Sequence, residues 1–214
     1  MDELEPQKSG VSRRTVTKAM AWAVPVIAIA APAPAFALSG EPPSVCAGEP
    51  YKVPGNSGCK AFSTGGTEVD VAKGFGFPLL VTNDTDQVIY IGEDIVVTIL
   101  YSEGGVPVLR SFPIVSSVPA LPAELQPGES VILFTYFNEE NSGGFTGRVR
   151  IVVPWGHPPA PDPSNHPDVV LEFCVTANQW HPITSDQCTP VTDLIAGGCS
   201  TDAPPPIGSC RGED

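Results

Sequence analysis

Three histidines and several acids near the C-terminal third of the chain have side chains that could bind a metal ion. Most of them lie in the proline-rich segment WGHPPAPDPSNHPD. The set consists of His157, Asp162, His166, Asp168 and His181. Imidazole and carboxylate ligands suit zinc or copper. However, His157 and His166 stand nine residues apart and match no H-x-H or H-E-x-x-H motif. We therefore predict loop histidines facing water and no cofactor; a metal site would require all three histidines to converge.

Two aspartates offer a second candidate cation site. Asp84 and Asp86 follow an apolar run in the sequence Asn83-Asp84-Thr85-Asp86. Carboxylates of this kind bind calcium, but the glycine and the closing glutamate of an EF-hand loop are missing. A turn closed by hydrogen bonds from these side chains explains the same residues.

Trp155 and Trp180 are the candidates for a ligand-binding face. Two exposed aromatic rings on one face could stack on sugar rings, which would make a carbohydrate-binding or cell-wall-binding accessory protein. The alternative is that both tryptophans belong to the core, because tryptophans near strand ends are commonly buried.

The six cysteines predict three disulfides. They are Cys46, Cys59, Cys174, Cys188, Cys199 and Cys210. In an exported protein an even number of cysteines indicates disulfides. The sequence contains no C-x-x-C pair, the spacing that would indicate a metal site. We predict a local Cys46–Cys59 bridge, with Cys174–Cys188 and Cys199–Cys210 favoured for the rest. Oxidised cysteines and the lack of G-x-S-x-G leave no candidate nucleophile, so we predict that the protein is not an enzyme.

The N-terminal segment has the features of an export signal. Arg13 and Arg14 precede a mildly apolar, alanine-rich stretch, and Ala35 and Ala37 suit a signal peptidase. The stretch is short and interrupted by prolines, so a membrane span is not expected in the mature protein. The segment resembles the twin-arginine leaders of small exported actinobacterial proteins, which implies a secreted, extracellular protein, free or wall-associated.

The strongly negative net charge of the chain argues against two classes of partner, nucleic acids and anionic membranes. The segment 1–37 holds three acids and four bases, which leaves 21 acids against seven bases and a net charge of about −14. Such a chain is repelled by phosphate backbones and by anionic lipids, so neither nucleic acid nor membrane is expected.

Short apolar runs with period two, separated by Gly, Pro, Asn and Asp, predict an all-β domain over 45–180. Predicted strands include 75–81, 95–101, 109–115, 129–137, 145–153 and 169–175. Pro113 places the third at an edge, and apolar residues on both faces of 129–137 indicate a central strand. We expect two packed antiparallel sheets after a spacer at 38–44. An irregular tail, 181–214, would be pinned by disulfides.

Leu125-Gln126-Pro127-Gly128-Glu129-Ser130 before an apolar strand, together with Val81-Thr82-Asn83, resembles bacterial immunoglobulin-like surface domains. Pro-Gly suits the centre of a type II turn, in which Gly takes a positive φ. The resemblance implies an immunoglobulin-like antiparallel β-sandwich that acts as a binding or interaction module. Its partner would be a surface protein or a wall polysaccharide.

Overall fold

The structure of the protein is a computed structural model that describes residues 41–55, 57–103, 105–138, 144–158, 166–184, 188, 193–205 and 210. All of them belong to one compact unit, Gly40–Asp214. The predictions for the leader, including Arg13, Arg14, Ala35 and Ala37, lie outside the described residues, as does Asp162.

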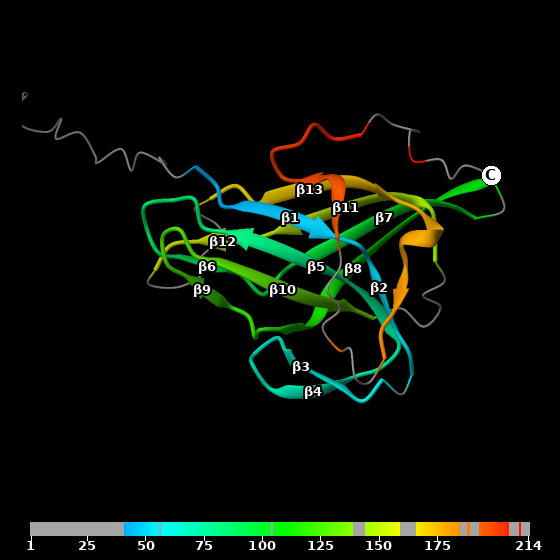
Figure 1. The fold of residues 1–214 in the computed structure, drawn as a ribbon, viewed down its shortest axis with the longest axis horizontal. Helices are drawn as coiled ribbons and strands as arrows, with labels where there is room; N and C mark the ends of the chain where they lie inside the picture. Colours follow the sequence, from blue (N-terminus) through cyan, green and yellow to red (C-terminus); the bar gives the residue numbers. More distant parts are fainter. Residues whose placement is uncertain are drawn as a thin grey trace, which may run out of the picture. The chain divides into compact units, whose positions relative to one another are not determined.

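The described residues form an all-β fold (Figure 1). The strands are β1 (Ser44–Gly48), β2 (Tyr51–Val53), β3 (Cys59–Ser63), β4 (Glu68–Val71), β5 (Gly74–Thr82), β6 (Ile89–Ile91), β7 (Val96–Glu103), β8 (Val106–Val118), β9 (Ala123–Leu125), β10 (Ser130–Phe137), β11 (Gly147–Val153), β12 (Trp155–Gly156), β13 (Val169–Val175), β14 (His181–Pro182) and β15 (Leu194–Cys199). One short 3-10 helix, η2 (Ala177–Gln179), follows β13. The all-β prediction is confirmed.

Two antiparallel sheets make up the sandwich. One has the order β15-β1-β5-β10-β8, and the other has the order β13-β11-β7-β8. If the strands β1, β5, β7, β8, β10, β11 and β13 are lettered A to G, the order includes A-B-E-D and G-F-C, as in immunoglobulin-type sandwiches. Unlike the strands C and D of those sandwiches, β7 and β8 pair with each other, which makes the two sheets continuous. The disulfide that joins strands B and F in antibody domains has no counterpart, because β5 and β11 contain no cysteine.

Strand β8 belongs to both sheets. Its first part, Val106–Pro113, pairs with β7, and residues from Ile114 onward pair with β10. The change of sheet occurs at Pro113, which has no N–H to donate to a ladder. Proline therefore lies where the strand leaves one sheet for the other, and the predicted edge position applies to the first part of β8.

The main core lies between the two sheets. Alternating side chains of β5, β7, β11 and β13 meet there, because successive residues of a strand point to opposite faces. Phe77 of β5, for example, has its ring centroid 5.8 Å from that of Phe173 of β13. The strands predicted around 75–81, 95–101, 129–137, 145–153 and 169–175 are present as β5, β7, β10, β11 and β13.

Central strand β10 is covered on both faces over part of its length, as predicted. Leu133 and Phe137 face the main core. Tyr136 faces a second, smaller cluster together with Tyr51, Cys59 and four other buried residues. The four are Val53, Ala61, Val71 and Ile183. Nearer the start of the strand Ile132 is 53% exposed, so the second cluster covers only the far half.

The predicted disulfide pairing is wrong. The bridges are Cys46–Cys199, Cys59–Cys188 and Cys174–Cys210. Each one joins a cysteine before residue 181 to a cysteine after it. Cys46 and Cys199 are register partners in the antiparallel pair β1–β15, so a strand pairing and not sequence proximity brings them together. The tail is thus pinned, as predicted, and its Leu194–Cys199 segment forms an edge strand.

Candidate functional site

One end of the sandwich collects most of the candidate residues. We call it the loop end and define it by residues 41–44, 83–94, 119–129, 154–158, 166–168 and 200–202. These segments meet because β5, β11 and β15 finish there, whereas β1, β7, β10 and β13 begin there. Alternate connections of an antiparallel sandwich lie at the same end, which brings together segments far apart in the sequence.

Asn83 organises the first loop of this end. Its Oδ1 accepts hydrogen bonds from the N–H and the hydroxyl of Thr85, at 3.0 and 2.7 Å. Its Nδ2 donates to the carbonyl oxygens of Gln87 and Leu125. The Asn-Asp-Thr-Asp turn predicted from the sequence is therefore present. The buried Asn83 also joins this loop to the segment before β10.

The predicted Pro-Gly turn completes this part of the loop end. Gly128 has a φ of +77°, and the N–H of Glu129 donates to the carbonyl of Gln126 at 2.9 Å. The N–H of Gly128 donates in turn to the carbonyl of Asn83 at 2.8 Å. Because Gly adopts a positive φ without steric cost, the turn can form at this position. The two turns recognised in the sequence thus contact each other.

A hollow of about 460 Å³ lies at the loop end. Acidic side chains line it from three separate segments: Glu41 before β1, Asp84 after β5 and Asp168 before β13. The carboxylate of Asp84 accepts a hydrogen bond from the N–H of Ser44 at 3.2 Å. Within the described residues no group of three or more His, Cys, Asp or Glu side chains is arranged to hold a metal ion. The calcium hypothesis for Asp84 and Asp86 receives no further support.

Both tryptophans of the candidate ligand face are buried, so they form no exposed face for stacking on sugar rings. Trp155 is 1% exposed and Trp180 is 7% exposed. Their indole N–H groups donate to backbone carbonyls, those of Pro167 and Phe145, each at 3.0 Å. A buried tryptophan needs such a partner for its N–H, and both strand ends supply one. The alternative that both tryptophans are core residues is therefore the one observed.

The structure brings two of the three histidines together. The ring centroids of His157 and His166 lie 4.8 Å apart, with the ring planes at 81°. Both rings contact Trp155, at centroid distances of 5.6 and 4.3 Å. His181 does not join them: it lies on β14, where its Nε2 pairs with the carboxylate of Glu49. The predicted exposed, separate loop histidines are thus replaced by a partly buried pair.

The two histidines of the pair differ in their surroundings. His157 Nδ1 lies 2.9 Å from the carbonyl oxygen of Val88, in the loop that Asn83 organises. His166 lies against the Trp155 ring, and burial together with the neighbouring His157 lowers the pKa of His166. Both effects penalise the charged imidazolium, so the His166 ring is neutral at neutral pH.

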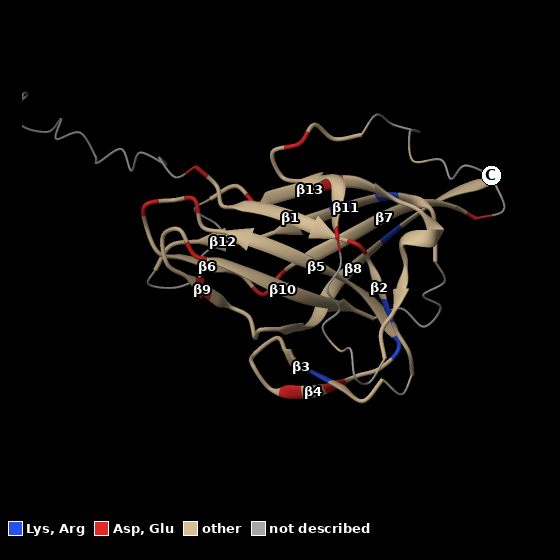
Figure 2. Ribbon diagram, viewed as in Figure 1, with Lys and Arg blue, Asp and Glu red and all other residues tan. Residues whose placement is uncertain are grey.

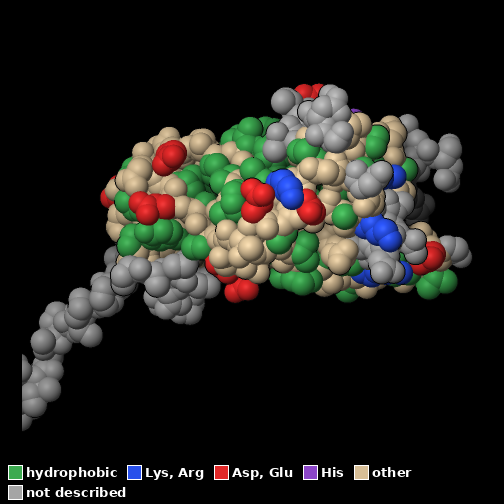
Figure 3. Space-filling model, turned by 90° about the horizontal axis from the view of Figure 1, so that it is seen from below, with side chains coloured by type: hydrophobic (Ala, Val, Ile, Leu, Met, Phe, Trp, Pro, Cys, Tyr) green, Lys and Arg blue, Asp and Glu red, His purple; other side chains and the backbone are tan. Residues whose placement is uncertain are grey.

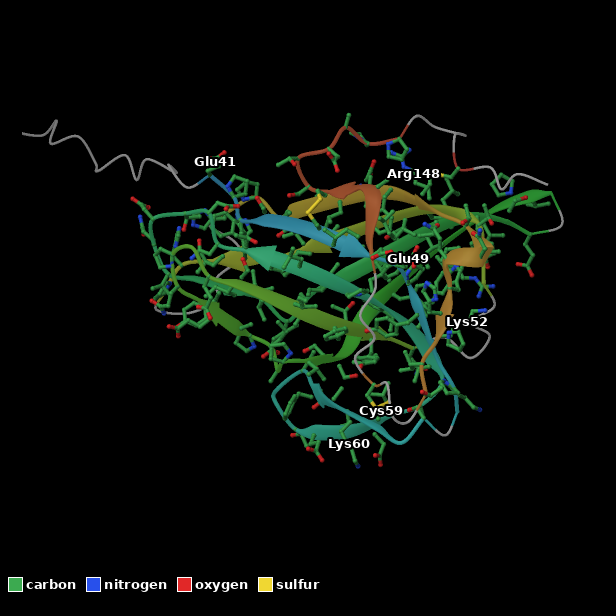
Figure 4. All side chains as sticks on the ribbon, in the orientation of Figure 1. Glu41, Glu49, Lys52, Cys59, Lys60 and Arg148 are labelled. Carbon is green, nitrogen blue, oxygen red and sulfur yellow. A yellow bond between two sulfur atoms is a disulfide. The ribbon has the colours of Figure 1, made fainter. Side chains whose placement is uncertain are left out.

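Charge is distributed unevenly over the molecule (Figure 2). The defined segments of the loop end contain nine acids: Glu41, Asp84, Asp86, Glu93, Asp94, Glu124, Glu129, Asp168 and Asp202. The same segments contain no lysine or arginine. Figure 4 shows Glu41 at this end and Lys52, Lys60 and Arg148 away from it. None of these acids stands out in the sequence when it is considered alone. The signal that could have revealed the acidic end is that every second turn between the predicted strands is rich in Asp and Glu.

The fold and the site thus define an antiparallel β-sandwich that is pinned by three disulfides and has an acidic loop end. No family model, curated protein or solved structure matches the chain.

Proposed function

We propose that the protein is a secreted, non-enzymatic binding module, exported by the twin-arginine route and active outside the cell, free or at the wall. Its three disulfides support an oxidising compartment, since such bridges form and persist outside the cytosol. Across the part of the chain that the structure describes, no helix has the length and apolarity needed to cross a membrane.

The observation that carries this proposal is the concentration of nine acids, without any lysine or arginine, on the described segments of the loop end. The loops that converge there come from both sheets, and a rigid sandwich holds them. Binding residues of such scaffolds are commonly placed on loops of this kind. A surface of one charge sign attracts an oppositely charged partner and increases the association rate.

The partner that fits this end is a surface protein with an exposed basic patch. A wall polysaccharide is the second candidate from the sequence, but the two tryptophans expected to stack on sugars are buried. Figure 3 shows one face of the molecule, on which acidic side chains lie in small groups among apolar and polar ones.

The test is sedimentation of the purified protein with isolated actinobacterial cell walls. Two wall preparations are used, one with its surface proteins and one stripped by protease. We expect the wild-type protein to sediment with the first preparation and to stay in solution with the second. Added salt should weaken the binding, because exposed charges are screened beyond about 10 Å at 0.1 M.

The matched variants remove two charges each. Asp84→Asn with Asp168→Asn acts at the loop end, and Glu68→Gln with Asp70→Asn acts on the exposed hairpin β3–β4. We expect only the loop-end variant to lose binding. Equal binding of both variants, or no sedimentation of the wild type with either preparation, would overturn the proposal. Binding to stripped walls would point to a polysaccharide instead.

A further inference from the structure

The separation of the two rings of the histidine pair can be compared with that of two imidazoles bound to one metal ion. In zinc sites the metal–nitrogen distance is 2.0–2.1 Å, which places the centroid of a bound imidazole about 3.2 Å from the metal. Two imidazoles bound to one metal at tetrahedral or square-planar angles then have centroids roughly 4.5–5.2 Å apart. The observed separation of His157 and His166 is 4.8 Å. The separation of the two ring centroids therefore matches that of two imidazoles bound to one ion.

The hydrogen bond of His157 leaves one of its nitrogens free to bind. The carbonyl oxygen of Val88, 2.9 Å from Nδ1, can only accept, so Nδ1 carries the proton of the neutral ring. Nε2 then keeps its lone pair. A metal-binding histidine commonly donates its second nitrogen to a backbone carbonyl in this way, which fixes the tautomer and the ring orientation.

Acidic residues lie on the chain segments that carry the pair or contact it. Asp168 follows His166 by two residues, and Asp84 and Asp86 lie in the loop that supplies the Val88 carbonyl. Neutral imidazole is the form that binds metals. All six cysteines are in disulfides, so no thiolate competes for the ion.

In place of the three-histidine site considered from the sequence, which His181 does not complete, we propose that His157 and His166 form a two-imidazole site for a divalent transition metal. The site would prefer Cu²⁺ over Zn²⁺, with its other coordination positions open. Imidazole suits both ions, and Cu²⁺ binds a given set of nitrogen and oxygen ligands more tightly than Zn²⁺ does. The open positions can take water or a donor from another molecule. The proposal is independent of the proposed binding function.

The experiment is a titration of the full chain, with its disulfides formed, with Cu²⁺ alone and with Zn²⁺ alone. Calorimetry gives stoichiometry and affinity, and we expect one site per chain. Cu²⁺, a paramagnetic ion, should also quench the fluorescence of Trp155, whose ring lies 4.3 Å from that of His166. Zn²⁺ should bind without quenching and should reverse the quenching when it is added in excess.

Three single variants complete the test. His157→Asn and His166→Asn should each weaken Cu²⁺ binding about tenfold or more and remove most of the quenching. His181→Asn, outside the pair, should bind as the wild type does. Circular dichroism and thermal unfolding establish that each variant folds. Lowering the pH to about 5 should release the metal, because protons compete with a metal ion for imidazole nitrogen.

Binding of equal strength in all three variants would place the ion elsewhere and overturn the proposal. The absence of heat and of quenching in the folded wild-type protein at millimolar metal would overturn it as well. Neither result bears on the sedimentation test, which uses no added metal.

Discussion

The sheet that contains β5 and β10 has a hydrophobic cluster on each face, and the two clusters are stabilised differently. The cluster between the sheets is large and free of disulfides, and its buried side chains are apolar apart from the N–H groups of its two tryptophans. The cluster on the outer face is small, and it contains two tyrosines and the Cys59–Cys188 bridge. Figure 4 labels Cys59 in this outer region. A large core gains enough from apolar burial alone, whereas a small one needs a covalent link as well.

The polar groups of the outer cluster are the hydroxyls of its two tyrosines. The hydroxyl of Tyr51 donates to the carbonyl of Thr135 at 2.7 Å, and that of Tyr136 donates to the carbonyl of Cys188 at 2.9 Å. The ring of Tyr51 passes so close to Gly76 that a Cβ on residue 76 would lie 2.4 Å from it. Glycine at this position is therefore needed for the tyrosine to cover the sheet.

The largest effect is expected from breaking the inner cluster. Phe77→Ala removes a fully buried ring that contacts Phe75, Phe173 and Trp180. The variant should lose about 3–5 kcal/mol of unfolding free energy, because the surrounding strands cannot close the cavity. Urea denaturation measures this loss.

Ile132→Ala is the control for that variant, because Ile132 lies on the neighbouring strand β10 and is half exposed. Its unfolding free energy should change by less than about 1 kcal/mol. Similar losses in the two variants would show that the inner cluster does not dominate the stability.

A somewhat smaller effect is expected from removing the bridge of the outer cluster. Cys59→Ala with Cys188→Ala should lower the unfolding free energy by about 2–4 kcal/mol. The segment from residue 181 onward should then be cleaved faster in limited proteolysis, while the strands of the sandwich stay protected. Denaturation and mapping of the cleavage sites check both points.

Removal of Cys174 and Cys210 by alanine substitution provides the comparison. This bridge spans 36 residues, whereas Cys59–Cys188 spans 129, so its loss should cost less in the chain-entropy view. If removal of the Cys59–Cys188 bridge changed neither the unfolding free energy nor the rate of proteolysis, the outer cluster would not depend on its disulfide.

The smallest effect is an alkaline destabilisation specific to the outer cluster. Burial raises the pKa of Tyr136 to about 12 and also raises that of Tyr51, mainly by desolvation. The folded protein therefore holds these protons more tightly than the unfolded chain, whose tyrosines titrate near pH 10. This stabilisation is complete below pH 10 and is lost as the pH rises through the folded pKa. For Tyr136 the loss amounts to ~2–3 kcal/mol by pH 12.

Urea denaturation of the wild type and of Tyr136→Phe between about pH 8 and pH 11.5 measures this dependence. The variant should show a shallower fall above pH 10, because it has one titrating group fewer in the cluster. An identical fall in the two proteins would mean that Tyr136 ionises with the same pKa in the folded and unfolded states.

Local features of the fold could be predicted from the sequence. Alternation of apolar residues defined β5, β7, β10, β11 and β13, and Pro113 indicated where β8 stands at an edge. The turns at Asn83 and at Pro127-Gly128 were recognised from residue types alone, since their hydrogen bonds join residues two to three positions apart. Apolar residues on both faces of β10 predicted that it is covered on both sides.

Contacts between residues that lie far apart in the sequence could not be predicted in this way. Sequence proximity suggested Cys46–Cys59, but the pairing of β1 with β15 puts Cys46 beside Cys199. Likewise, the spacing of His157 and His166 suggested separate loop residues, yet both rings pack on Trp155.

The sequence by itself determined where strands and turns form, that the cysteines are even in number and that the protein is strongly acidic. Only the tertiary structure decided the disulfide pairing, the burial of both tryptophans, the meeting of two histidines and the collection of acids at one end. The physical reason is the range of the interactions involved. Strand and turn preferences depend on neighbouring residues, whereas these four features depend on which strands pair and which sheet faces are buried.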